Sequence, residues 1–69
     1  MKITIPIEER DKAVQQALTT RRGDRTKLLE IIEGDILIVG AEPVLDEHAF
    51  GRLVGLRAEL RQSLGMPAF

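Results

Sequence analysis

Three arginines gather in the segment TTRRGDR, at positions 21, 22 and 25. Guanidinium groups beside the free N–H groups of a helix N-terminus are typical of a site for phosphate or another anion. Arg21, Arg22 and Arg25 are therefore a candidate anion or nucleic-acid contact. The alternative is a solvated basic loop, because Asp24 would compete for the same N–H groups.

Residues suited to metal binding or catalysis are few. The side chains that could ligate a metal and lie close in sequence are Glu42, Asp46, Glu47 and His48, but they show no recognised ligand spacing. The chain has no cysteine, and its single serine, Ser63, has no histidine near it in sequence. A chain of 69 residues also leaves little room for a substrate pocket. We therefore expect no metal, no cofactor and no enzymatic activity.

Two glycines, Gly51 and Gly55, stand four residues apart in a segment with a helical pattern. Each costs about 1 kcal/mol against alanine inside a helix, which suggests that another backbone approaches there. That backbone would belong either to a second chain or to the same chain. With Arg52 and Arg57, whose guanidinium groups can fork onto carboxylates, the glycines form a candidate interface.

Charges are banded along the second half of the sequence. From residue 30 to residue 47 the chain carries six acidic side chains and no basic one, whereas residues 52 to 61 carry three arginines and one glutamate. Such banding favours a complementary interface, within the chain or between chains. The alternative is a solvated surface, on which exposed ion pairs contribute about 0–1 kcal/mol each.

Length and composition point to association with another protein. The chain allows a single domain, residues 1–69, whose small core cannot be reinforced by disulfides. We therefore expect a protein partner, most simply a homodimer. The net charge of −1 does not favour nucleic acid, and no apolar run approaches the roughly 20 residues that span a membrane. The N-terminus lacks an apolar signal segment, so we expect a cytoplasmic protein.

At the N-terminus, the alternation in KITIPI predicts a strand over about 2–6, with Pro6 at its end or at a sheet edge. Alternatively, Pro6 could lie just inside the start of a helix. The following segment predicts a helix over about 7–20. It begins with acidic residues, which favour a helix N-terminus, and Gly23 follows it as a stop.

The segment LLEIIEGDILIVG has two interpretations. In the first, Asp24 caps a helix over about 25–33, Gly34 ends it, and 35–39 is a buried strand. In the second, strands at about 27–32 and 35–39 form a hairpin over Glu33 and Gly34. The β-branched content supports strands, whereas the lack of alternation in LLEII opposes the hairpin.

The clearest predicted element is a helix over about 46–64. Asp46 is a natural N-cap, Leu45 and Phe50 fit a hydrophobic staple, and Gly65 is a natural end. These elements predict an α+β fold in which a two- or three-stranded sheet has helices packed on one face. The function expected from all of this is a small protein–protein interaction module, such as a regulator, inhibitor or accessory subunit. The alternative is a DNA-binding regulator that uses the loop from Arg21 to Arg25.

Overall fold

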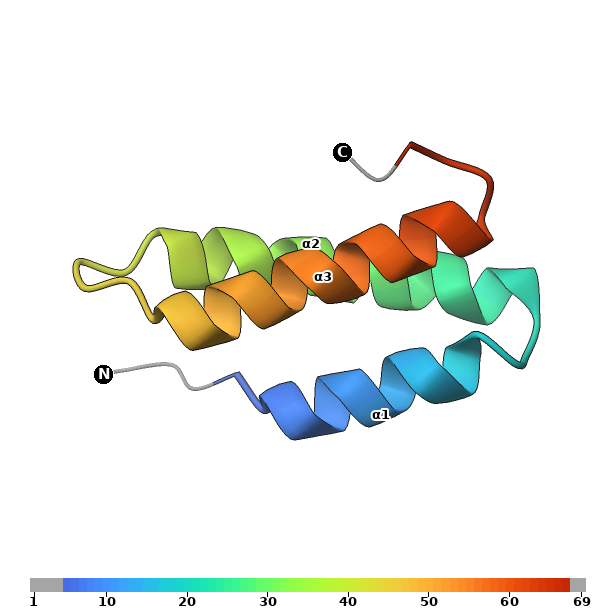
Figure 1. Cartoon of the computed structure of the whole chain (residues 1–69), viewed down its shortest axis with the longest axis horizontal. Helices are drawn as coiled ribbons and strands as arrows, with labels where there is room; N and C mark the ends of the chain where they lie inside the picture. Colours follow the sequence, from blue (N-terminus) through green and yellow to red (C-terminus); the bar gives the residue numbers. More distant parts are fainter. Residues whose placement is uncertain (1–4, 68–69) are drawn as a thin grey trace.

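Three α-helices form all of the regular secondary structure in residues 5–67, the part of the chain that the computed structural model describes. Their bounds are Ile7–Ala17 for α1, Arg22–Gly40 for α2 and Glu47–Ser63 for α3. Helices α1 and α3 run in the same direction, and α2 runs opposite to both (Figure 1). Within residues 5–67 there is no strand, so the predicted α+β fold is wrong and the domain is all-α.

The largest correction concerns α2, which continues through Gly34. The strand predicted over 35–39 and the hairpin with 27–32 are wrong, and the helix predicted over 25–33 is too short. The reason is the spacing of Leu29, Ile32, Ile36 and Val39, which are all buried on one helical face. Because this packing extends to both sides of Gly34, the low helix propensity of one glycine does not end the helix.

The N-terminal prediction is partly outside the described residues. Of the strand predicted over 2–6, residues 2–4 are not described, and Ile5 and Pro6 lie in no strand. Pro6 instead occupies the N-cap position of α1. The helix predicted over 7–20 is confirmed at its start, and it ends earlier, at Ala17, where Thr19 and Thr20 form a turn.

Helix α3 confirms the helix predicted over 46–64. The carboxylate of Asp46 accepts a hydrogen bond from the backbone N–H of Ala49 at 3.1 Å, as expected of an N-cap. At the other end Gly65 has a φ of 75°, in the left-handed region that favours glycine. The backbone N–H of Met66 then reaches the carbonyl of Arg61 at 2.8 Å, which closes a Schellman motif.

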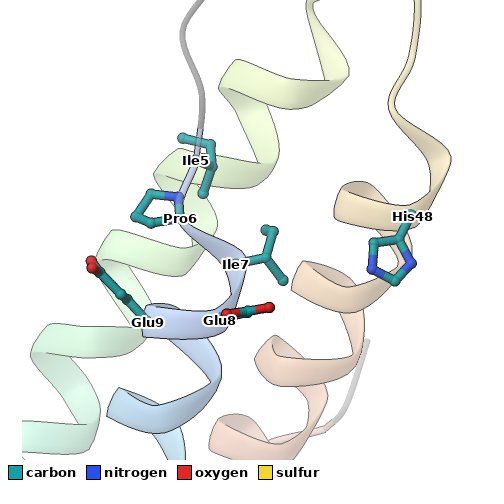
Figure 2. A pocket seen from close by; sticks show the side chains of 6 residues that line it. All are labelled: Ile5, Pro6, Ile7, Glu8, Glu9 and His48. Atoms are coloured by element: carbon teal, nitrogen blue, oxygen red, sulfur yellow. The ribbon is translucent and has the colours of Figure 1, made fainter.

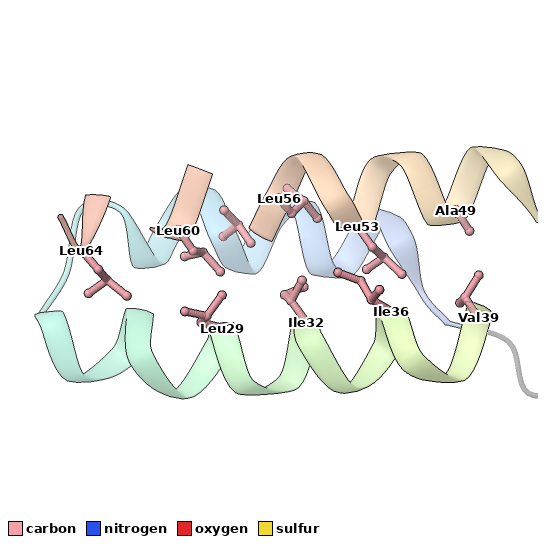
Figure 3. Packing of buried hydrophobic residues seen from close by; sticks show 10 residues of the cluster. Leu29, Ile32, Ile36, Val39, Ala49, Leu53, Leu56, Leu60 and Leu64 are labelled. Atoms are coloured by element: carbon pink, nitrogen blue, oxygen red, sulfur yellow. The ribbon is translucent and has the colours of Figure 1, made fainter. Parts of the chain in front are cut away.

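The core lies between the three helices and is aliphatic. Buried residues of α2 face buried residues of α3 along nearly their full lengths (Figure 3). The side chains with no exposed surface are those of Val14, Ile32, Leu53, Leu56 and Leu60. The buried residues of α3, Ala49, Leu53, Leu56 and Leu60, therefore form the face of this helix that packs in the core.

Each pair of helices is also joined by one ion pair. Arg10 of α1 lies 2.6 Å from Asp35 of α2, Arg52 of α3 lies 2.6 Å from Asp11 of α1, and Arg61 of α3 lies 3.1 Å from Glu33 of α2. Asp35 is the one buried carboxylate among residues 5–67. The Arg10–Asp35 pair therefore has the largest energetic consequence if one partner is removed.

Candidate protein-interaction surface

The two predicted interface glycines lie on the outward side of α3. Gly51 is exposed and Gly55 is half-exposed, whereas Leu53 between them is fully buried. A Cβ atom built on either glycine would meet no heavy atom of the described chain within 4 Å. Packing inside the chain therefore does not account for these glycines.

The two predicted interface arginines are placed differently. Arg52 donates to the carboxylate of Asp11 at 2.6 Å, so it already joins α3 to α1. Arg57 is half-buried, and its Nε atom is buried without a hydrogen-bond partner among the described residues. The guanidinium groups of Arg52 and Arg57 are therefore not both exposed beside Gly51 and Gly55.

The open surroundings of Gly55 lead to a stability prediction. We expect Gly55→Ala to raise the free energy of unfolding by up to about 1 kcal/mol, because alanine favours the helix and meets no obstacle. Gly65→Ala is the matched control and should lower it by about 1–2 kcal/mol, because Gly65 has a positive φ. Urea unfolding followed by circular dichroism measures both changes. A loss of stability in Gly55→Ala would show that the glycine is packed within its own chain.

Two of the three predicted anion-binding arginines make contacts inside the chain. Arg22 donates to the carbonyl of Leu64 at 2.9 Å, and Arg25 donates to the carbonyl of Ser63 at 3.1 Å. These carbonyls belong to the end of α3, where the last C=O groups have no partner within the helix. The two arginines therefore fasten the start of α2 to the end of α3.

The third arginine, Arg21, is separate from the other two. It precedes α2 at the N-cap position, and its side chain is 87% exposed. Its guanidinium group lies 3.6 Å from the carboxylate of Asp24, which stands in the first turn of α2 and is not the N-cap. The structure therefore does not gather Arg21, Arg22 and Arg25 around one anion site.

The surface that the sequence analysis did not identify is the outward side of α2. Large aliphatic side chains there are exposed: Leu37 by 75%, Ile31 by 49% and Ile38 by 39%. We call this the α2 outer face, and we define it by Lys27, Glu30, Ile31, Gly34, Leu37, Ile38 and Ala41. Residues 27, 31, 34, 38 and 41 are spaced by four or three, so they share one line along the helix. A surface helix normally carries polar residues on this side.

One signal in the sequence could have revealed this face. Ile31 and Ile38 are seven residues apart, which places them on the same side of a helix, and Ile32 and Ile36 lie on another side. The division of the segment at Gly34 hid this relation, because it assigned Ile31 and Ile38 to different elements. When α2 is treated as one helix, it has two apolar sides. The side with Ile32 and Ile36 packs in the core, and the side with Ile31 and Ile38 does not.

The loop between α2 and α3 adds apolar surface at one end of the bundle. Val44 is 85% exposed and Leu45 is 43% exposed. At the same end, the loop lies near the start of α1 and the start of α3 (Figure 1). Val44 belongs to no helix, so it provides a comparison for an exposed aliphatic residue outside the α2 outer face.

A pocket of about 440 Å³ lies at the same end, between the start of α1 and the start of α3. It is lined by Ile5, Pro6, Ile7, Glu8, Glu9 and His48. Ile7 and the ring of His48 come from the two helices that border it (Figure 2). The pocket brings together none of the predicted interface or anion-binding residues.

Two further findings concern metal ligands and the length of the helices. Within residues 5–67, no group of three or more His, Cys, Asp or Glu side chains is arranged to hold a metal ion. In the same range, no helix has the length and apolar character needed to cross a membrane.

Comparison with protein-family models, with curated proteins and with solved structures gave no match.

Proposed function

We propose that this chain is a protein–protein interaction module and that the α2 outer face is its binding surface. The role is that of a small regulator, inhibitor or accessory subunit without catalytic activity of its own, in the cytoplasm. The observation that carries the proposal is the exposure of Ile31, Leu37 and Ile38 on a helix whose opposite side already completes the core.

The energetic argument compares the two sides of α2. Leu29, Ile32, Ile36 and Val39 are at most 9% exposed, so the folded chain already uses its inner apolar side. Burial of a large aliphatic side chain contributes about 1.5–3 kcal/mol, and most of this remains to be gained at Leu37. A binding partner would supply that burial. Exposed apolar groups that lie together on one surface are typical of protein interaction sites.

No observation favours the alternative of a DNA-binding regulator. Arg22 and Arg25 donate to carbonyls at the end of α3, and Arg21 lies beside Asp24. DNA binding needs a basic surface that is free to contact phosphates. We therefore propose no second function.

The experiment is a comparison of captured proteins. A tagged chain is expressed in cells of its own host, and the proteins that it captures are quantified by mass spectrometry. Untagged copies of the chain are counted among the captured proteins. The test variant is Leu37→Glu, and the matched control is Val44→Glu, an exposed aliphatic outside the α2 outer face. We expect at least one protein to be retained by the wild type and by Val44→Glu and to be lost with Leu37→Glu. Equal recovery with all three chains would contradict the proposal.

A further inference from the structure

We infer that the partner on the α2 outer face is a second copy of this chain, packed with its α2 antiparallel to the first about a two-fold axis near Gly34. The inference rests on the proposed function, because it names the occupant of the same surface. It is carried by three features of that face, namely the order of its apolar residues, the glycine between them and the charges at its two ends.

Two of the three exposed aliphatic residues of this face, Ile31 and Ile38, lie nearly symmetrically about Gly34. Ile31 precedes Gly34 by three residues, and Ile38 follows it by four. A two-fold axis perpendicular to the helix reverses the direction of the second copy and keeps its outward side facing the first. Ile31 of each copy then lies opposite Ile38 of the other. Four partly exposed isoleucines, each 39% or 49% exposed in the single chain, would cover one another.

Gly34 permits the close approach that this packing needs. A Cβ built on Gly34 would meet no heavy atom of the described chain within 4 Å, so packing inside the chain does not require a glycine. In a helix interior it costs about 1 kcal/mol relative to alanine. At the crossing point of two helices, a residue without a side chain allows the backbones to come close and lets the flanking isoleucines interdigitate.

The charges at the ends of the face select the antiparallel direction. Lys27 is exposed and lies in α2, seven residues before Gly34. Glu42 is half-exposed and lies next to the face, in the turn two residues beyond the end of α2. Within residues 5–67 neither side chain takes part in an ion pair. Lys27 lies roughly 10 Å from Gly34 along the helix axis at about 1.5 Å of rise per residue, and Glu42 lies in the turn just beyond the other end of α2. The antiparallel arrangement therefore brings Lys27 to the same end as Glu42 of the second copy. A parallel arrangement would place Lys27 opposite Lys27.

The outward side of α3 offers less to a second copy. It also contains glycines, Gly51 and Gly55, but none of its residues is among the large hydrophobic side chains exposed in residues 5–67. Its glycines are flanked by Phe50 and Val54, which are partly buried against the core, and by no large hydrophobic side chain that is exposed. This difference makes Gly55 a matched control for Gly34, because both are helix-interior glycines with open space at the Cβ position.

The first experiment is sedimentation equilibrium over the micromolar range, with circular dichroism to check folding. We expect the wild-type mass to rise from 7.7 kDa towards twice that value as the concentration increases. Gly34→Leu should remain folded and stay at the monomer mass, because its side chain would occupy the crossing point. Gly55→Leu should behave as the wild type does. A wild-type mass of 7.7 kDa at all concentrations, or loss of the dimer in Gly55→Leu alone, would overturn the inference.

A second set of variants decides the matter if Gly34→Leu fails to fold. Lys27→Glu and Glu42→Lys should each weaken dimerisation about tenfold, and the double variant should restore it, because the pair is reversed but kept. Single variants that dimerise as the wild type does would overturn the inference. If the chain is monomeric but Leu37→Glu still abolishes capture of a different protein, the proposed function stands and the inference fails.

Discussion

Truncation of Leu53 or Leu60 to alanine is expected to lower the free energy of unfolding by about 2–5 kcal/mol in each case. Both side chains have no exposed surface and lie on the face of α3 that packs in the core (Figure 3). Each truncation removes buried methyl groups and leaves a cavity that the bundle cannot fully close. Stability near 0.05–0.15 kcal/mol per residue gives a domain of this size roughly 3–10 kcal/mol in total, so either variant is close to unfolding at 37 °C.

Urea unfolding followed by circular dichroism measures these losses, on dilute protein so that association does not contribute. Leu37→Ala is the matched control, because it is the same substitution at a side chain that is 75% exposed, and its midpoint should stay near that of the wild type. Midpoints close to the wild type for both Leu53→Ala and Leu60→Ala would show that the core is assigned to the wrong face of α3.

Removal of one partner from the Arg10–Asp35 pair gives the second large effect. We expect Arg10→Met to lower the free energy of unfolding by about 3–5 kcal/mol, because it leaves the carboxylate of Asp35 buried without its cation. The side chain of Asp35 is 8% exposed and that of Arg10 is 27% exposed. The double variant Arg10→Met with Asp35→Leu should recover most of the lost free energy of unfolding, because no unpaired charge remains buried.

The control for this prediction is the Arg52–Asp11 pair, which has the same 2.6 Å separation. Its side chains are 39% and 38% exposed, so water can solvate whichever charge is left. Arg52→Met should therefore cost only about 0–1 kcal/mol. Two results would contradict the claim that burial of Asp35 makes removal of its partner costly. One is an equal loss of free energy of unfolding in Arg10→Met and Arg52→Met, and the other is an additive loss in the Arg10–Asp35 double variant.

The sequence was sufficient to predict α3 because its signals are local. Asp46 is three residues from the N–H that it caps, and Gly65 adopts the positive φ that ends the helix. The apolar residues Ala49, Leu53, Leu56 and Leu60 between them are spaced by three or four, which is the spacing of one helical face. Nothing in these signals depends on the position of the other helices.

The sequence was insufficient for α2 because two of its local signals conflict with its packing. Gly34 is typical of a helix end, and the β-branched run after it is typical of a strand. The core contacts of Ile32 and Ile36, on either side of the glycine, outweigh both tendencies. A prediction that weighted the continuous spacing from Leu29 to Val39 above the single glycine would have found one helix.

The candidate sites differ in how far they could be predicted. The contacts of Arg22 and Arg25 join residues 42 and 38 positions apart, so no local pattern could reveal that they cap the end of α3. The α2 outer face could have been predicted, because Ile31 and Ile38 are seven residues apart and share one side of a continuous helix. The outward position of Gly51 and Gly55 was also predictable, but what approaches them was not.

The most direct test of the account is a single-cysteine cross-link at the proposed two-fold axis. The chain has no cysteine, so Gly34→Cys introduces one thiol at a defined place. Two copies can form a disulfide only if their Cα atoms come within about 4.4–6.8 Å, which holds near a two-fold axis between close helices. Under mild oxidation, we predict a covalent dimer for Gly34→Cys and little or none for Gly55→Cys, as seen on a non-reducing denaturing gel. Equal cross-linking of the two variants, or preferential cross-linking at position 55, would contradict the account.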